Sequence, residues 1–170
     1  MIPLSVYIFL LIQLVAVSYG DLKTKKIPNL WSLMNMVLYV MLLFIAPEFY
    51  SLQLRTFFFP LAFLLVGFVL FLLHIMGGGD SKYLSCLYLL IPVRCQELAF
   101  SYLLYSTLII GSLIFIMLSL KRYKELWEYM IMGQIHKIRD LYGSKFSFAP
   151  VIFFGWIWMG VDMNVLLYVR

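Results

Sequence analysis

Phe57 to Met76 reads FFFPLAFLLVGFVLFLLHIM and is followed at once by Gly77-Gly78-Gly79-Asp80. An apolar run of this length is what a helix needs to cross a bilayer. An acid at its end is a candidate functional residue, because burying an unpaired charge at membrane depth is costly. The glycines would loosen the helix and let another backbone approach the acid. The alternative is a glycine-rich turn that ends the helix and leaves Asp80 exposed.

The composition of the whole chain points to the membrane as well. Of 170 residues, 64% are hydrophobic and only 12% are charged, whereas a soluble domain carries about 25% charged residues. The apolar runs are continuous and do not alternate, which favours an all-α bundle over a β-barrel. The net charge of +5 fits basic cytoplasmic loops and gives no reason to expect nucleic acid. Cys86 and Cys95 have no metal-site spacing and are expected to be small buried or interfacial residues.

Six apolar runs predict about six transmembrane helices in a single domain of residues 1–170. They are Met1–Gly20, Leu30–Ala46, Phe57–Met76, Ser81–Val93, Leu98–Leu120 and Phe148–Val169. The first run lacks a basic start and a clear cleavage site, so we expect a retained helix and not a signal peptide. The fourth is the weakest, since it would cover only about 20 Å of a bilayer of roughly 30 Å.

The basic residues test this layout. The loops after the first, third and fifth runs share one side and hold ten of them: Lys23, Lys25, Lys26, Lys82, Lys121, Arg122, Lys124, Lys137, Arg139 and Lys145. The opposite side holds Arg55, Arg94 and Arg170. This bias places the basic side in the cytoplasm and both termini outside. If the fourth run were a re-entrant loop instead, most of the bias would vanish.

Two acids flank apolar runs on the basic side, next to residues that break helices. Asp21 follows the first run and precedes Ile27-Pro28-Asn29, and Asp80 follows the third run. Although far apart in sequence, they are predicted at the same depth. The remaining acids fall near the outer side or in the long polar loop: Glu48, Glu97 and Asp162, and Glu125, Glu128 and Asp140.

The polar segment 121–147 is expected to be a cytoplasmic loop with an amphipathic helix on the membrane surface. Its apolar residues recur near helical spacing: Leu126, Met130, Ile135, Ile138 and Leu141. Gly133 weakens this prediction, and an irregular solvated loop is the alternative.

Two carboxylates held close together cannot easily both ionise, so the pair presents an acid and a base at once. The ionised member can activate water while the protonated member polarises a peptide carbonyl, which is aspartic peptidase chemistry. Other mechanisms have less support, because His74 and His136 lack a partner pattern and HExxH is absent. A metal held by Asp21, Asp80 and His74 is a weaker alternative. We expect no metal and no cofactor.

The motifs around both aspartates resemble those of the type IV prepilin peptidase family, membrane aspartic peptidases of the GxGD type. In that family the first aspartate precedes a basic stretch ending in Ile-Pro-Asn, and residues 21–29 here read DLKTKKIPN. The second lies in GxGD followed by x-Lys-Leu, and residues 77–84 read GGGDSKYL, with Tyr83 where leucine is usual. A late proline motif is similar to KFSFAP at 145–150, with Gly155 further on.

The resemblance implies a hydrolase that removes the short basic leader of prepilins or pilin-like pseudopilins. It would act at the cytoplasmic face of the inner membrane, with Asp21 and Asp80 as the catalytic pair. Larger family members carry an insert with two CxxC pairs that is associated with methylation. This chain has none and resembles the short, peptidase-only type. The expected partners are the prepilin and membrane lipid, and the sequence leaves the oligomeric state open.

Nine further positions are expected to support the pair or the substrate: Gly77, Gly78, Gly79, Lys82, Pro28, Asn29, Pro150, Glu125 and Glu128. The glycines would leave room for an extended substrate backbone. Lys82 would favour ionised Asp80 or extend to the membrane surface. Pro28 and Asn29 would form a turn and a helix start. The two glutamates would offer acidic contacts to a basic leader.

Three other functions stay open from the sequence. An archaeal preflagellin peptidase shares both motifs. Presenilin-like peptidases fit less well, because they carry Pro-Ala-Leu where this chain has Ala149-Pro150-Val151. A non-enzymatic channel, transporter or scaffold would use Asp21 and Asp80 to bind an ion or a proton.

Overall fold

The computed structural model describes residues 2–73, 76–121, 123 and 148–163. These residues form six α-helices and contain no strand, which confirms the all-α class. The helices are α1 (Leu4–Thr24), α2 (Asn29–Ile45), α3 (Leu54–Leu72), α4 (Gly78–Leu89), α5 (Val93–Lys121) and α8 (Ala149–Asp162).

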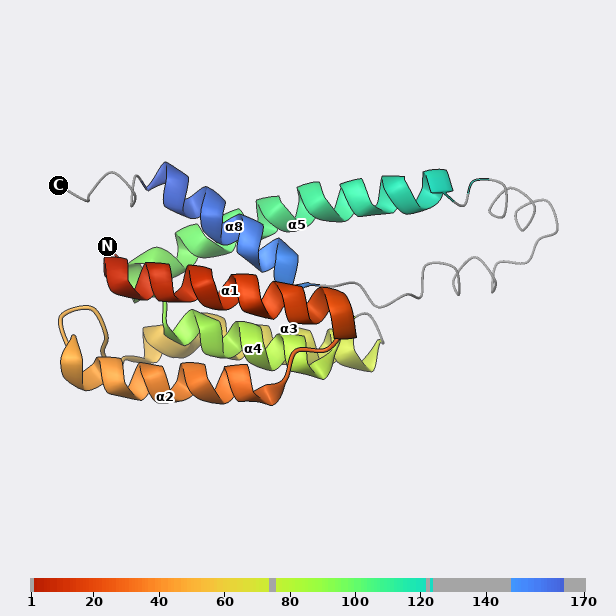
Figure 1. The fold of residues 1–170 in the computed structure, drawn as a ribbon. Helices are drawn as coiled ribbons and strands as arrows, with labels where there is room; N and C mark the ends of the chain where they lie inside the picture. Colours follow the sequence, from red (N-terminus) through yellow and green to blue (C-terminus); the bar gives the residue numbers. More distant parts are fainter. Residues whose placement is uncertain (1, 74–75, 122, 124–147, 164–170) are drawn as a thin grey trace.

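From α1 to α5, successive helices run in opposite directions (Figure 1). The short helix α4 packs between α2 and α3, and α8 packs between α1 and α5. The end of α1 and the starts of α2, α4 and α8 therefore lie at one end of the bundle. We call it the lysine end, after Lys23, Lys26 and Lys82. The opposite end is the arginine end, after Arg55 and Arg94 near the starts of α3 and α5.

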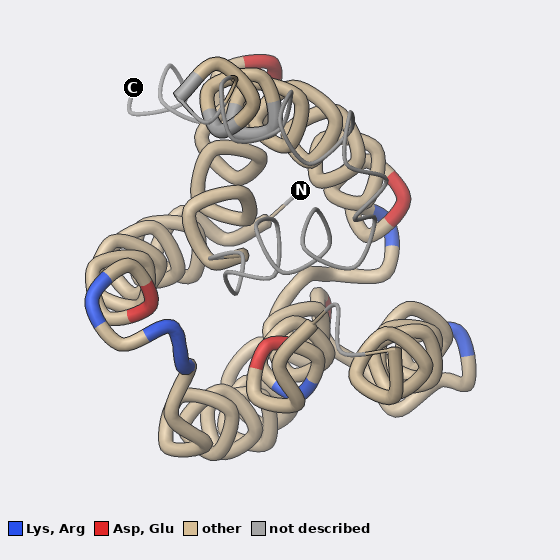
Figure 2. Tube along the Cα trace, turned by 90° about the vertical axis from the view of Figure 1, so that its right-hand side faces the viewer, with Lys and Arg blue, Asp and Glu red and all other residues tan. Residues whose placement is uncertain are grey.

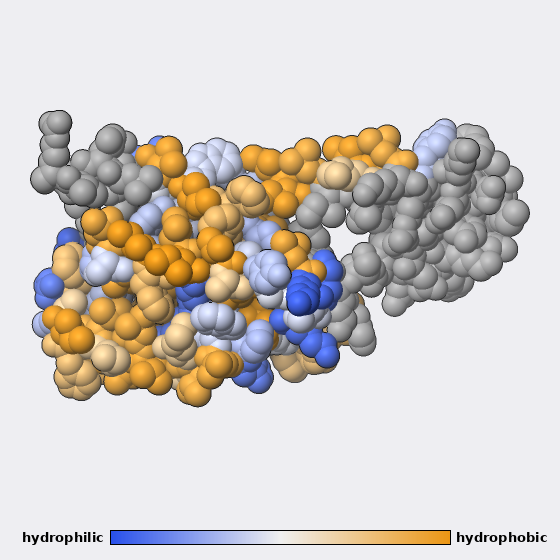
Figure 3. Space-filling model, viewed as in Figure 1, coloured by the Kyte–Doolittle hydropathy of each residue, from blue (hydrophilic) through white to orange (hydrophobic). Residues whose placement is uncertain are grey.

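The outer surface of the bundle is strongly apolar. Hydrophobic side chains cover much of the face shown in Figure 3, and hydrophilic ones gather where α1 ends. Among the described helices, α1 and α3 are long and apolar enough to cross a membrane, while α2 and α8 are apolar but shorter. These features indicate a membrane protein, since soluble proteins rarely expose apolar surface on this scale. Six complete crossings stay a prediction.

Four of the first five helices have boundaries that differ by three residues or more from those expected. The third runs from Leu54 to Leu72 and not from Phe57 to Met76. The first helix continues past Gly20 to Thr24, because no helix breaker occurs before Lys25, which takes a left-handed φ of 53°. The fourth begins at Gly78 and not at Ser81, and its 12 residues span about 18 Å. The fifth begins at Val93 and not at Leu98, directly after Pro92, so the polar residues that follow lie in its first turns.

The arginine end is held together by buried polar side chains. Tyr50, between α2 and α3, donates to the carbonyl of Leu90 at the end of α4 over 2.9 Å. Burial chiefly raises the pKa of Tyr50, so its hydroxyl stays protonated and keeps donating. Gln96 of α5 donates to the carbonyls of Thr56, Tyr88 and Ile91. Two of these carbonyls lie at or just after the end of the short helix α4, and the Thr56 carbonyl is open because Pro60 of α3 has no N–H to offer it.

A polar junction joins α1, α2 and α4 inside the apolar core. Gln13 Nε2 donates to Asn35 Oδ1 over 2.6 Å, and the Tyr83 hydroxyl donates to Gln13 Oε1 over 3.4 Å. All three side chains are buried. Because polar groups pair in an apolar core or cost free energy, the junction sets how these three helices align.

Small residues let α8 lie close to α1 and α5. The ring of Tyr7 stacks on that of Trp156 at 5.2 Å between centroids, and each residue donates a hydrogen bond to the other's carbonyl. The Tyr7 hydroxyl lies against Gly160, where a larger residue would collide with it. A Cβ at Gly155 would come within 3.2 Å of the Tyr102 carbonyl on α5. The expected Gly155 of the late motif thus serves close helix packing.

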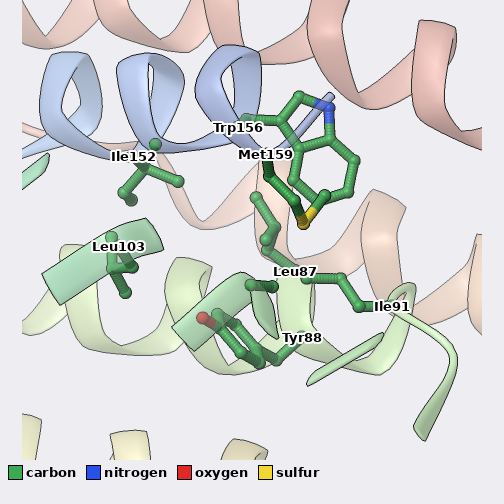
Figure 4. A pocket seen from close by; sticks show the side chains of 9 residues that line it. Leu87, Tyr88, Ile91, Leu103, Ile152, Trp156 and Met159 are labelled. Carbon is green, nitrogen blue, oxygen red and sulfur yellow. The ribbon is translucent and has the colours of Figure 1, made fainter. Parts of the chain in front are cut away.

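A small apolar cavity of about 10 Å³ lies where α4, α5 and α8 meet (Figure 4). Leu87, Trp156 and Met159 are among the side chains that line it. A water molecule needs roughly 10–15 Å³ of such space together with polar partners. The cavity is therefore a packing defect and too small for a substrate or cofactor.

The polar junction predicts a specific loss of stability. Gln13→Leu leaves Asn35 Oδ1 and the Tyr83 hydroxyl without the hydrogen bonds that Gln13 provides. We expect the free energy of unfolding, measured in detergent micelles, to fall by about 1–3 kcal/mol. Val15→Leu, on the exposed face of α1, is the matched control and should change it by less than about 0.5 kcal/mol. Equal stability of the two variants would contradict the role of the junction.

Candidate active site

Asp21 lies in the last turn of α1, where its side chain is only 2% exposed. The negative end of the α1 dipole disfavours a carboxylate at this position. The start of α8 offsets this, because the backbone N–H of Ala149 donates to Asp21 Oδ2 over 3.1 Å. The N-terminus of a helix is electropositive, so α8 stabilises negative charge on Asp21.

Asp80 is the third residue of α4 and is 7% exposed. Its Oδ2 accepts the N–H of Gly77 over 3.2 Å, and its own N–H donates to the Gly77 carbonyl over 3.1 Å. This reciprocal pair satisfies groups that a helix start leaves open. An acid in the first turn also suits the α4 dipole.

The start of α4 packs directly on the loop that follows Asp21. A Cβ built on Gly79 would lie 2.6 Å from the carbonyl oxygen of Ile27, six residues after Asp21. Only glycine allows this approach without a shift of backbone. Figure 2 looks onto the lysine end, where the end of α1 and the start of α4 both face the viewer. The structure therefore brings the segments carrying the two aspartates to one end of the bundle.

The glycines do not form the unwound stretch that the sequence suggested. Gly77 caps α4 with an extended backbone, while Gly78 and Gly79 lie in its first helical turn. Because the three glycines directly follow an apolar stretch, the sequence suggested the loosened end of that helix and not the start of a new one. The face of Gly79 is filled by Ile27, so it leaves no room for a substrate backbone, whereas Gly77 is exposed.

The other predicted residues of the described chain lie around the same end. Pro28 immediately precedes α2 and Asn29 begins it, as expected for a turn and a helix start. Lys82 is exposed on α4, two residues after buried Asp80. Pro150 is the second residue of α8 and is half-buried, directly after the residue that donates to Asp21.

Several predicted features lie outside the described residues. Glu125 and Glu128, the amphipathic helix expected within 121–147 and both histidines, His74 and His136, belong to this group. Within the described residues, no three His, Cys, Asp or Glu side chains are close enough to hold a metal ion. Cys86 is half-buried and Cys95 buried, and both are free thiols.

Sequence reasoning missed two contributions to this end of the bundle. The backbone N–H of Ala149 belongs to no side-chain motif, although a proline at the second helix position is a sign of a helix start with free N–H groups. The bond between Tyr83 and Gln13 links α4 to α1. Tyr83 stands where the family pattern has leucine, and this departure from the pattern was its only signal.

Comparison with models of protein families shows which family the chain belongs to. The model of the type IV leader peptidase family matches residues 8–120, which include Asp21 and Asp80. The chain belongs to this family. Membership indicates a peptidase, hence a hydrolase, and agrees with the membrane character of α1 and α3. The match ends before α8, so the Pro150 motif lies outside it. Neither the curated proteins nor the solved structures gave a significant match.

Two neighbouring glycines test the contact between α4 and the Ile27 loop. Both Gly78→Ala and Gly79→Ala gain helix propensity at adjacent positions, by up to about 1 kcal/mol each. A Cβ at Gly78 meets only the Phe71 ring, at 3.6 Å, whereas one at Gly79 meets the Ile27 carbonyl oxygen at 2.6 Å. We expect Gly79→Ala to be less stable than Gly78→Ala by about 1–3 kcal/mol when both are unfolded under the same conditions. Equal stability would mean that α4 does not rest on this loop.

Proposed function

We propose that this chain is an aspartic endopeptidase that removes the basic leader of type IV prepilins or pilin-like proteins. Asp21 and Asp80 are the catalytic pair in this proposal. The observation that carries it is a pair of buried carboxylates at the lysine end, each accepting a backbone N–H at a helix start. The family match adds the peptidase activity to this geometry.

The chemistry needs one proton shared between the two acids. The ionised carboxylate takes a proton from water, and the oxygen of that water attacks the scissile carbonyl. The protonated carboxyl donates its proton to the carbonyl oxygen as the tetrahedral intermediate forms. Collapse of the intermediate transfers a proton to the leaving amine and breaks the C–N bond. Titration of the shared proton belongs to the pair and not to one aspartate.

We propose that the lysine end faces the cytoplasm and that the six helices cross the inner membrane. Charge supports this orientation, because Lys23, Lys26 and Lys82 are exposed at this end, whereas Arg55 and Arg94 lie at the other. Basic residues favour the cytoplasmic side of a membrane. The pair would then lie at the depth where the leader of a prepilin meets its apolar helix.

A substrate at this end must present an extended peptide bond, because a helical bond is shielded by its own hydrogen bonds. Of the three glycines, the exposed Gly77 is the one whose surface a substrate backbone can reach. Glu125 and Glu128 stay our proposed contacts for a basic leader. Reversing both charges should weaken leader processing if the proposal is correct.

Separate replacement of the two acids tests the proposed function. We expect Asp21→Asn and Asp80→Asn each to reduce cleavage of a co-reconstituted prepilin by at least about 10²–10⁴-fold, since each removes an acid–base group. The readout is the rate of leader release, followed by mass spectrometry. Asp162→Asn, at the exposed end of α8 near the arginine end, should cleave at the normal rate. Leader release that survives either of the first two substitutions would remove the catalytic pair.

A further inference from the structure

The arginine end carries a cleft that the proposed peptidase reaction does not use. It has a volume of about 610 Å³ and lies between the starts of α3 and α5. Charged and aromatic side chains line it: Arg55, Arg94, Glu97, Phe58 and Phe59. A second cleft of about 310 Å³ shares both arginines and adds Glu48. Volumes of roughly 300–1,000 Å³ are typical of sites for small ligands.

The charged side chains that line these two clefts do not pair with one another. Among the described residues, no carboxylate forms an ion pair with Arg55 or Arg94. All four charged side chains, including Glu48 and Glu97, are exposed. Positive and negative side chains that line one cleft without forming ion pairs are both available to bind a ligand. The arrangement therefore favours a ligand that itself carries an anion and a cation.

The local helix ends favour an anion between the two arginines. Neither α3 nor α5 has an acid in its first turn, and each has an arginine as its second residue. No side chain caps the start of α3. A cation beside the positive end of a helix dipole is unfavourable, and a bound anion reverses this at both helices. Arginine forks match the oxygens of a phosphate better than a lysine would.

A buried side chain fixes the part of the cleft that lies between the two arginines. Gln96 also lines the larger cleft, and it is only 1% exposed. Its amide donates to the carbonyl of Thr56, next to Arg55, over 3.3 Å. This bond ties the first turn of α3 to the first turn of α5, and so holds the two arginine-bearing turns together.

An apolar surface continues from the cleft along α3. Phe58 lines the cleft and is 67% exposed, and Leu54 is 93% exposed. Further apolar side chains of α3 are exposed beyond them: Leu61, Leu65 and Phe68. A ligand seated between the arginines could therefore lay an apolar tail along α3.

We propose that this cleft binds the headgroup of a phospholipid of the phosphatidylethanolamine class. The phosphate lies between Arg55 and Arg94, the primary ammonium donates to Glu97, and an acyl chain follows Phe58 along α3. A choline headgroup cannot donate hydrogen bonds to Glu97, and a glycerol headgroup carries no cation. Free phosphate lacks both the cation and the tail. The inference does not depend on which peptide the protein cleaves.

Native mass spectrometry of the full chain in detergent tests this site. The protein is offered phosphatidylethanolamine, phosphatidylcholine or phosphatidylglycerol with identical acyl chains. We expect the first to bind about tenfold more tightly than the second, the difference that a charge-assisted hydrogen bond provides. Arg55→Lys/Arg94→Lys, which keeps both charges but loses the forks, should weaken binding of all three. Glu97→Gln should remove the preference for phosphatidylethanolamine over both other lipids, because the ammonium then has no carboxylate to bind.

Lys23→Gln/Lys26→Gln, which changes two exposed cations at the lysine end, is the matched control and should bind like the unmodified protein. Equal binding of the three lipids to the unmodified protein would overturn the proposal. So would unchanged binding by a folded Arg55→Gln/Arg94→Gln variant, with folding checked by its unfolding temperature. Displacement of the lipid by inorganic phosphate at equal concentration would also overturn it, because the cleft would then take a free anion.

Discussion

Burial of two carboxylates at one end of an apolar bundle is the constraint on which the rest of the structure depends. A carboxylate taken out of water must receive hydrogen bonds in its place, or it costs several kcal/mol. Asp21 and Asp80 meet this need in the same way, through backbone N–H groups at the starts of α8 and α4. The dipoles of these helices favour the same charge. Two helix starts and one helix end therefore have to meet at the lysine end, and the antiparallel order of the helices provides this.

Close packing at small residues delivers those helix starts. Gly155 and Gly160 let α8 lie against α5 and α1, and the stacked rings of Tyr7 and Trp156 fix it there. With α8 held in this way, its first N–H reaches Asp21. Gly79 does the same for α4 by allowing contact with the Ile27 carbonyl. The glycines matter less for flexibility than for how near one backbone can come to another, and this close packing brings the helix ends that carry the two acids to one end of the bundle.

Much of this arrangement could be predicted from the sequence, and there are physical reasons why the rest could not. Apolar runs and charge bias indicated an all-α membrane protein with Asp21 and Asp80 at the same end, and the motifs around them indicated the family that the comparison shows. The start of the fifth helix was predicted too late because Gln96 has the character of a loop residue, whereas it lies in the first turn of α5 and donates to three carbonyls outside that helix. The bond from the Ala149 N–H to Asp21 could not be predicted, since Pro150 signals a helix start but not which acid lies against it.

The most direct test of the account is whether the two acidic positions face each other in the folded protein. Asp21→Cys/Asp80→Cys is made in a background with Cys86 and Cys95 replaced by serine, then treated with a short bifunctional thiol reagent in the membrane. Mass spectrometry of the digested protein detects the cross-linked peptides. The account predicts an efficient intramolecular cross-link, and none for Asp21→Cys/Arg94→Cys, whose cysteines lie at opposite ends of the bundle. Equal cross-linking of the two pairs, or none for Asp21→Cys/Asp80→Cys, would contradict it.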